Sequence, residues 1–212
     1  VYAQVVDLLQ STPGAIQFSG DLKIEDEYIN DAISNYNLPL ESKRSNIYKA
    51  NLSARKNIVS RFSWSWLFEQ SDKVRFEEEI PALDASYLIT DKENELNYFS
   101  AFDPNKPTNG FIQASDWELF IDSPAAYPIA YEVIATFLQS QMFRSMEEVL
   151  ELTHRKPIGC LNDFCQDKSQ VLLKLRTADI CKNCMSILKE RVDPSILKHA
   201  IALMESLRLK MK

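Results

Sequence analysis

The sequence predicts an α+β fold with a metal-binding segment in its last quarter. Three observations carry this prediction: strand-like segments gather between residues 86 and 121, helical periodicity follows them, and all four cysteines lie after residue 159. Of the 212 residues, 45% are hydrophobic and 25% are charged, which is the composition of a globular protein with one substantial core or two small ones.

The residues before the first strand predict helices. Residues 26–36 form a short amphipathic pattern. Residues 52–67 are a second helical candidate, although Trp64 and Trp66, separated by one serine, also fit a strand. The turn formers at residues 11–14 would separate a further helix at the N-terminus.

Four short segments predict the strands. Residues 86–90 are typical of a buried strand, and residues 98–102 predict another that ends at the turn formers of residues 103–107. Residues 110–113 and 117–121 then predict one bent strand or two short ones. The strands therefore occupy one continuous part of the chain, as in an α+β fold.

Helical periodicity returns after the strands. From Pro128 to Met142 the apolar residues recur at intervals of three and four. Residues 145–152 predict a second helix in this part, because Ser145 with Glu148 three residues later forms a capping box.

The last helix is predicted to begin at Asp193, whose side chain can cap it, followed by Pro194 in the first turn. Its apolar stripe leaves His199 at the surface or boundary of the helix. We therefore expect a core domain over residues 1–152 and a segment over residues 153–212, which holds a metal knuckle and the last helix and packs with the core as one unit.

The four cysteines give the strongest indication of chemistry. They follow the pattern Cys160-x4-Cys165-x15-Cys181-x2-Cys184. Two short-spaced pairs at this separation predict a tetrahedral zinc site, because each short loop directs two sulfurs to one ion and the insert brings the pairs together. Four ligands leave no open position for water, so the Zn²⁺ would be structural and would stabilise the C-terminal quarter.

Other interpretations of the cysteines remain open. Two disulfides would need an oxidising compartment, a redox-active CxxC pair would need thioredoxin-like surroundings, and the thiols could also stay unpaired. His154, six residues before Cys160, is an alternative ligand in place of one sulfur. The local candidates to offset the negative charge of a thiolate centre are Lys168, Lys174, Arg176 and Lys182.

Composition excludes several classes of function. The net charge of -6 disfavours nucleic-acid binding, which needs a basic face to neutralise phosphates. Four glycines cannot assemble a Gly-rich phosphate cradle. No stretch approaches the roughly 18 to 20 apolar residues of a membrane span, and no signal peptide is visible, so we expect no membrane partner and a cytoplasmic location.

Candidates for catalysis are few. The two histidines are too far apart for an HExxH helix, and neither GxSxG nor SxxK occurs. Asp116 and Glu118 would share one side of a strand, and Glu132 lies in an otherwise apolar helix where burial disfavours the charged form. These residues do not make an active site, so we expect no catalytic residue.

Strands followed by a helix and then by the Cys-x4-Cys and Cys-x2-Cys pairs resemble the archaemetzincin group of zincin metallopeptidases. The resemblance covers roughly residues 86–184, and its specific part is the cysteine quartet. It implies a zincin-like mixed sheet with helices and a C-terminal zinc knuckle. Where the family has its HExxH stretch, residues 130–135 read AYEVIA without a histidine, and the insert between the cysteine pairs is shorter than the family's. The resemblance therefore implies a structural metal site and an extinct peptidase site.

Two classes of function follow. The first is a zinc-stabilised, non-catalytic interaction or sensor domain with a protein partner or a place in a larger assembly. The second is a metal-dependent hydrolase or peptidase with a non-standard active site. Most aromatic residues are expected in the core, and those proposed to meet a partner or small ligand are Trp64, Trp66, Phe102 and Trp117.

Overall fold

The computed structural model describes residues 1–20 and 61–211. These residues form seven α-helices and a three-stranded mixed sheet, so the predicted α+β class is confirmed. The predicted helix at residues 26–36 and the first part of the candidate at residues 52–67 lie outside the described residues. Among the residues that are described, no helix has the length and apolar character needed to span a bilayer.

The sheet consists of β1 (Ser86–Thr90), β2 (Ser100–Phe102) and β3 (Asn109–Gln113) in the order β1-β3-β2. The central strand β3 runs parallel to β1 and antiparallel to β2. All five of its residues are buried, as expected for a strand with neighbours on both edges and helices on both faces. The three strand predictions in this region are confirmed.

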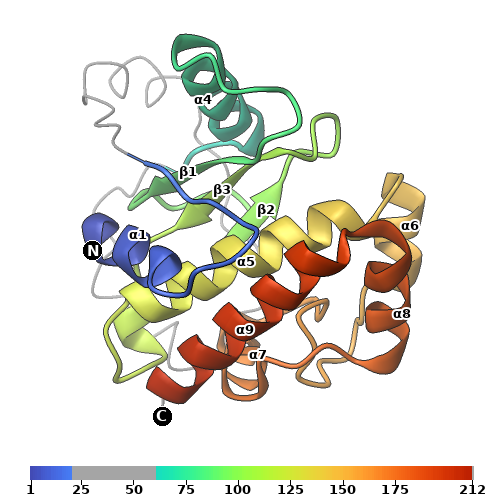
Figure 1. Ribbon diagram of the computed structural model, residues 1–212. Coiled ribbons are helices and arrows are strands. Elements are labelled where there is room, and N and C mark those ends of the chain that lie inside the picture. Colours follow the sequence, from blue (N-terminus) through green and yellow to red (C-terminus); the bar gives the residue numbers. More distant parts are fainter. Residues whose placement is uncertain (21–60, 212) are drawn as a thin grey trace.

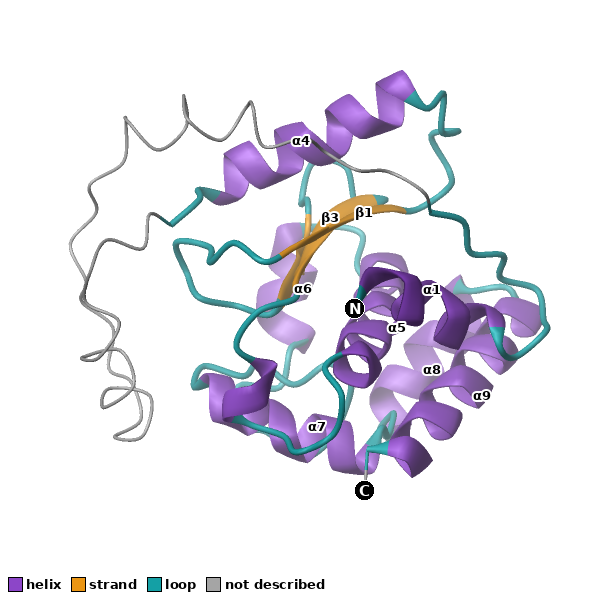
Figure 2. Ribbon diagram, turned by 90° about the vertical axis from the view of Figure 1, so that its left-hand side faces the viewer, coloured by secondary structure: helices purple, strands orange, loops and turns teal. Residues whose placement is uncertain are grey.

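Each face of the sheet is covered by a helix. Helix α4 (Trp64–Glu77) packs on β1 and β3, and helix α5 (Ala126–Met142) packs on β2 and β3 from the other side (Figures 1 and 2). The Ser63 side chain caps α4 by accepting a hydrogen bond from the Trp66 N–H group. Trp64 and Trp66 therefore belong to a helix and not to a strand.

Helix α5 is the centre of the molecule. It contacts α1 (Tyr2–Gln10), α8 (Lys182–Arg191) and α9 (Pro194–Lys210) on the side away from the sheet (Figure 1). Thirteen of its residues are buried, which explains why its apolar pattern extends around most of the helix. The predicted helix from Pro128 is confirmed and begins two residues earlier.

Two short helices connect α5 to the C-terminal pair. Helix α6 (Met146–Leu152) follows its N-cap residue Ser145, whose hydroxyl accepts the Glu148 N–H group. The Glu148 carboxylate accepts the Arg144 N–H group and not that of Ser145, so only one of the two bonds of the predicted capping box forms. Helix α7 (Val171–Thr177) follows a 3-10 turn at Lys168–Gln170. The long segment between α6 and this 3-10 turn contains no helix and none of the three strands of the sheet, and it carries the first two cysteines.

The strand predicted at residues 117–121 is wrong. Trp117–Leu119 form a 3-10 turn that follows Asp116, which has a left-handed backbone with φ of 70°. The indole Nε1–H group of Trp117 donates to the Gln113 carbonyl oxygen at 3.0 Å, so the chain folds back over the end of β3. Asp116 and Glu118 consequently do not share one side of a strand.

The prediction that His199 lies at the surface or boundary of its helix is also wrong. Its imidazole is 5% exposed, and Nδ1 accepts the Ile16 N–H group at 3.0 Å. The Nε2 atom lies 2.7 Å from the Thr12 carbonyl oxygen and therefore carries the proton. His199 thus fixes the segment after α1 to α9, an interaction between distant residues that helical periodicity does not reveal.

We expect His199→Ala to lower the free energy of unfolding by about 1–3 kcal/mol, because the Ile16 N–H group would lose its buried acceptor. Chemical denaturation of the purified variant measures this loss. The neighbouring exposed position supplies the control, since Lys198→Ala should change stability by less than about 0.5 kcal/mol. Equal stability of the two variants would contradict the role of the imidazole.

Candidate metal centre

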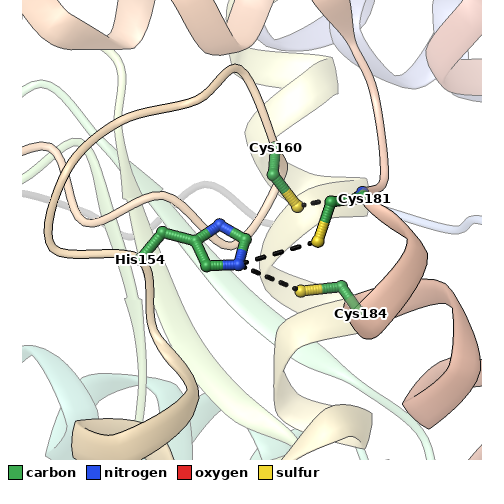
Figure 3. Close-up of side chains that lie close together, drawn as sticks. All are labelled: His154, Cys160, Cys181 and Cys184. Atoms are coloured by element: carbon green, nitrogen blue, oxygen red, sulfur yellow. Dashed lines mark hydrogen bonds between the residues drawn. The ribbon is translucent and has the colours of Figure 1, made fainter.

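Four side chains converge beside the N-terminus of α8. The ligand atoms of His154, Cys160, Cys181 and Cys184 all lie within 4.8 Å of one another (Figure 3). The His154 Nε2 atom is 3.7 Å from the sulfur of Cys181 and 3.7 Å from that of Cys184. One imidazole and three thiols with a common centre form a group that could hold a metal ion.

This group differs at one position from the four cysteines that the spacing predicts. Cys160, Cys181 and Cys184 are brought together, whereas His154 takes the place of Cys165. The Cys165 sulfur is not part of the converging group and lies 3.8 Å from the Asp163 carbonyl oxygen. Burial raises the pKa of Cys165 to about 11, so this thiol keeps its proton near neutral pH.

Backbone hydrogen bonds bring His154 to the cysteines. The His154 N–H group donates to Asn162 O at 3.1 Å, and the Phe164 N–H group donates to His154 O at 2.9 Å. The segment after α6 therefore runs alongside the loop that follows Cys160, like a minimal strand pair. This pairing directs the imidazole towards the centre, and it directs the chain at Cys165 away from it.

Asp163 organises this loop, although it is not one of the four converging residues. Its Oδ1 atom lies 3.0 Å from His154 Nδ1, which leaves Nε2 facing the sulfurs. Its Oδ2 atom accepts the N–H groups of Ile158, Gly159 and Cys160 at 2.8, 2.6 and 3.1 Å. The buried carboxylate of Asp163 thus orients the imidazole of His154 and the backbone of Cys160. Carboxylates that hydrogen-bond to metal ligands commonly have this role.

Gly159 is required by the shape of the same loop. Its φ of +87° lies in the left-handed region that residues with a side chain rarely adopt. A Cβ atom at this position would also come 2.7 Å from the Thr177 side chain. The glycine before the first cysteine therefore allows the loop to lie directly against Thr177, the last residue of α7.

The second cysteine pair uses a helix N-terminus. Cys181 is the N-cap residue of α8, and Cys184 lies in its first turn. The unpaired N–H groups and the dipole at this end favour negative charge, which stabilises thiolates. The Cys181 N–H group also donates to the Cys160 sulfur at 3.4 Å, and Asn162 Nδ2 donates to the Cys184 sulfur at 3.6 Å.

Close approach of the thiols changes their ionisation. The hydrogen bond from Cys184 lowers the pKa of Cys160 to about 6, although burial acts in the opposite direction. The same shared proton, together with burial, raises the pKa of Cys184. A dication at the centre would replace the shared proton and hold all three sulfurs as thiolates.

The other residues that the sequence singled out lie elsewhere. Lys168 pairs with Asp116 at 3.8 Å, and Lys174 pairs with Glu132 at 3.4 Å, so both lysines have carboxylate partners outside the converging group. Burial of Glu132, expected from its apolar helix, is confirmed at 1% exposure. Sequence reasoning missed Asp163, and the only signal for it was its place between two cysteines in a loop that also contains Gly159.

Comparison with protein-family models, with curated proteins and with solved structures finds no match to this chain. The interpretation of the site therefore depends on its own geometry.

We expect Cys181→Ser to lose bound metal and the folded structure of residues 154–184, because a missing ligand uncouples metal binding from the folding of this segment. Cys165→Ser should keep both, because this thiol lies outside the cluster. Elemental analysis of the purified variants measures the difference. Loss of metal in Cys165→Ser together with full retention in His154→Ala would contradict this group of ligands. It would show that the four cysteines bind the metal, as their spacing predicts.

We expect Asp163→Asn to weaken metal binding by about 10–100-fold, because the orienting partner of a ligand imidazole is lost. Competition with a chromophoric chelator measures the affinity. Asp167→Asn is the matched control, since Asp167 caps only the 3-10 turn at Lys168–Gln170. Equal affinities for the two variants would show that Asp163 does not support the centre.

Proposed function

We propose that this chain is a zinc-stabilised, non-catalytic domain for sensing or interaction. The observation that carries the proposal is the convergence of His154 with Cys160, Cys181 and Cys184. A set of three sulfurs and one nitrogen is typical of structural zinc. When bound, the ion supplies four bonds that join the loop after α6 to the start of α8.

The distances support tetrahedral coordination. With a zinc–sulfur bond of about 2.3 Å and a zinc–nitrogen bond of about 2.0 Å, a tetrahedral centre places nitrogen and sulfur roughly 3.5 Å apart. Both distances from His154 Nε2 to the sulfurs of Cys181 and Cys184 are 3.7 Å. Four protein ligands complete the tetrahedron, so no position remains for a reacting water molecule.

The positions of the two histidines argue against a second, catalytic metal site. The chain contains two histidines; His154 belongs to the cluster, and both ring nitrogens of His199 face backbone groups of Thr12 and Ile16. On the proposed relationship to archaemetzincins, the helix that would carry the peptidase site is α5. Its Glu132 is paired with Lys174 and accompanied by no histidine, which supports an extinct site.

The proposed thiolate zinc centre supports the proposed cytoplasmic location. None of the four cysteines forms a disulfide within the described residues. Thiolate zinc centres persist where thiols stay reduced, and the same compartment disfavours disulfides. In that compartment the domain would bind a partner protein or a small ligand.

We expect native mass spectrometry to find one zinc ion per chain. Removal of the ion by a strong chelator should increase amide hydrogen exchange over residues 154–184, because the ion joins their ends, while the β1-β3-β2 sheet stays protected. A fully protected, metal-free chain would overturn the proposal. Two metal ions, one of them easily removed, would favour the alternative of a metal-dependent hydrolase.

A further inference from the structure

A cavity of about 200 Å³ lies between β2, α5, α6 and the loop of the metal centre. Exposed residues at its rim, Pro104, Met146 and Phe164, leave it open to solvent. Aromatic side chains make up much of its wall, and those that line it are Trp64, Tyr98, Phe99, Phe102, Phe143 and Phe164.

A buried ion pair also lines this cavity. Glu132 and Lys174 are 1% and 5% exposed, and Glu132 Oε1 lies 3.4 Å from Lys174 Nζ. The other carboxylate oxygen, Oε2, accepts the Ser100 hydroxyl at 2.8 Å. Apart from this ion pair, Oε1 has no hydrogen-bond partner among the described residues. The pair thus offers an acceptor oxygen with unused capacity beside an ammonium that has three donors.

The chemistry of this pair selects a complementary group. Buried polar atoms are normally hydrogen-bonded, so Oε1, whose partner is the Lys174 ammonium at 3.4 Å, has capacity for a further hydrogen-bond donor. The carboxylate and the ammonium neutralise one another, which favours an uncharged partner over an ion. An N–H group beside a carbonyl oxygen would serve both, with its hydrogen towards Oε1 of Glu132 and its oxygen towards Nζ of Lys174.

The walls and the volume restrict the rest of the molecule. Aromatic side chains favour a flat, apolar body that can stack on them. Drug-sized ligands occupy pockets of about 300–1,000 Å³, so a cavity of about 200 Å³ accepts one or two fused rings and not a peptide. We propose that the cavity binds a small, uncharged, planar compound that carries an N–H group beside a carbonyl oxygen, as a lactam does.

This inference rests on the proposed sensing function and names the class of its ligand. The link is structural, because Asn162, Asp163, Phe164 and Cys165 form one side of the cavity and belong to the loop of the metal centre. A bound ring would therefore contact the loop whose conformation Asp163 and His154 maintain. Ligand binding and metal binding would stabilise the same segment.

Isothermal titration of the zinc-loaded chain with 2-quinolone tests the inference. We expect binding, and we expect N-methyl-2-quinolone to bind about tenfold or more weakly, because it lacks the N–H donor. Equal affinity for both compounds would overturn the lactam assignment, and tighter binding of 2-naphthoate would overturn the preference for an uncharged ligand. No binding of 2-quinolone would overturn the proposed ligand class.

Variants locate the binding within the cavity. Val149→Phe should fill the cavity from α6 and abolish binding, whereas Leu150→Phe, at an exposed position of the same helix, should not. The double variant Glu132→Leu/Lys174→Met replaces the ion pair by apolar groups and should bind 2-quinolone and its N-methyl form equally. Loss of binding in Leu150→Phe, or full binding in Val149→Phe, would overturn the location.

Zinc content separates this inference from the proposed function. A chain with one zinc ion that binds no 2-quinolone retains the structural metal centre and refutes the cavity ligand. A folded chain without metal refutes the zinc-stabilised domain whatever 2-quinolone does. Each variant is therefore compared at equal zinc content.

Discussion

The loop of the metal centre depends on the carboxylate of Asp163. This one buried group faces the imidazole of His154 and also accepts three consecutive backbone N–H groups that end at Cys160. Unpaired buried N–H groups are costly, so the carboxylate determines the path of the chain as well as the direction of the ring. The positions of two proposed ligands therefore follow from one side chain that binds no metal itself.

Much of the fold was predictable because its signals are local. The apolar pattern from Pro128, the serine before α6 and the Asp193-Pro194 start of α9 each depend on neighbouring residues. The strand at residues 117–121 failed because a hydrogen bond from the Trp117 indole to the Gln113 carbonyl oxygen imposes a turn on an apolar segment. No pattern within that segment distinguishes the two outcomes.

The candidate metal site was likewise predictable where its signals are local and not where it depends on tertiary contacts. Cysteine spacing singled out three members of the converging group, and position along the chain made His154 a plausible substitute. The exclusion of Cys165 comes from the pairing of residue 154 with residues 162 and 164, which depends on tertiary structure. The ion pair between Glu132 and Lys174 joins residues of α5 and α7 that are 42 positions apart in the numbering, so sequence indicated only the buried carboxylate.

The contact between His199 and the segment after α1 also constrains the order of folding during synthesis. Thr12 and Ile16 meet their partner on α9, nearly the whole described chain later. Chains emerge from the ribosome in order, so this segment has to wait until α9 has been made before it can dock. One edge of the core next to α5 thus stays incomplete until α9 has been made.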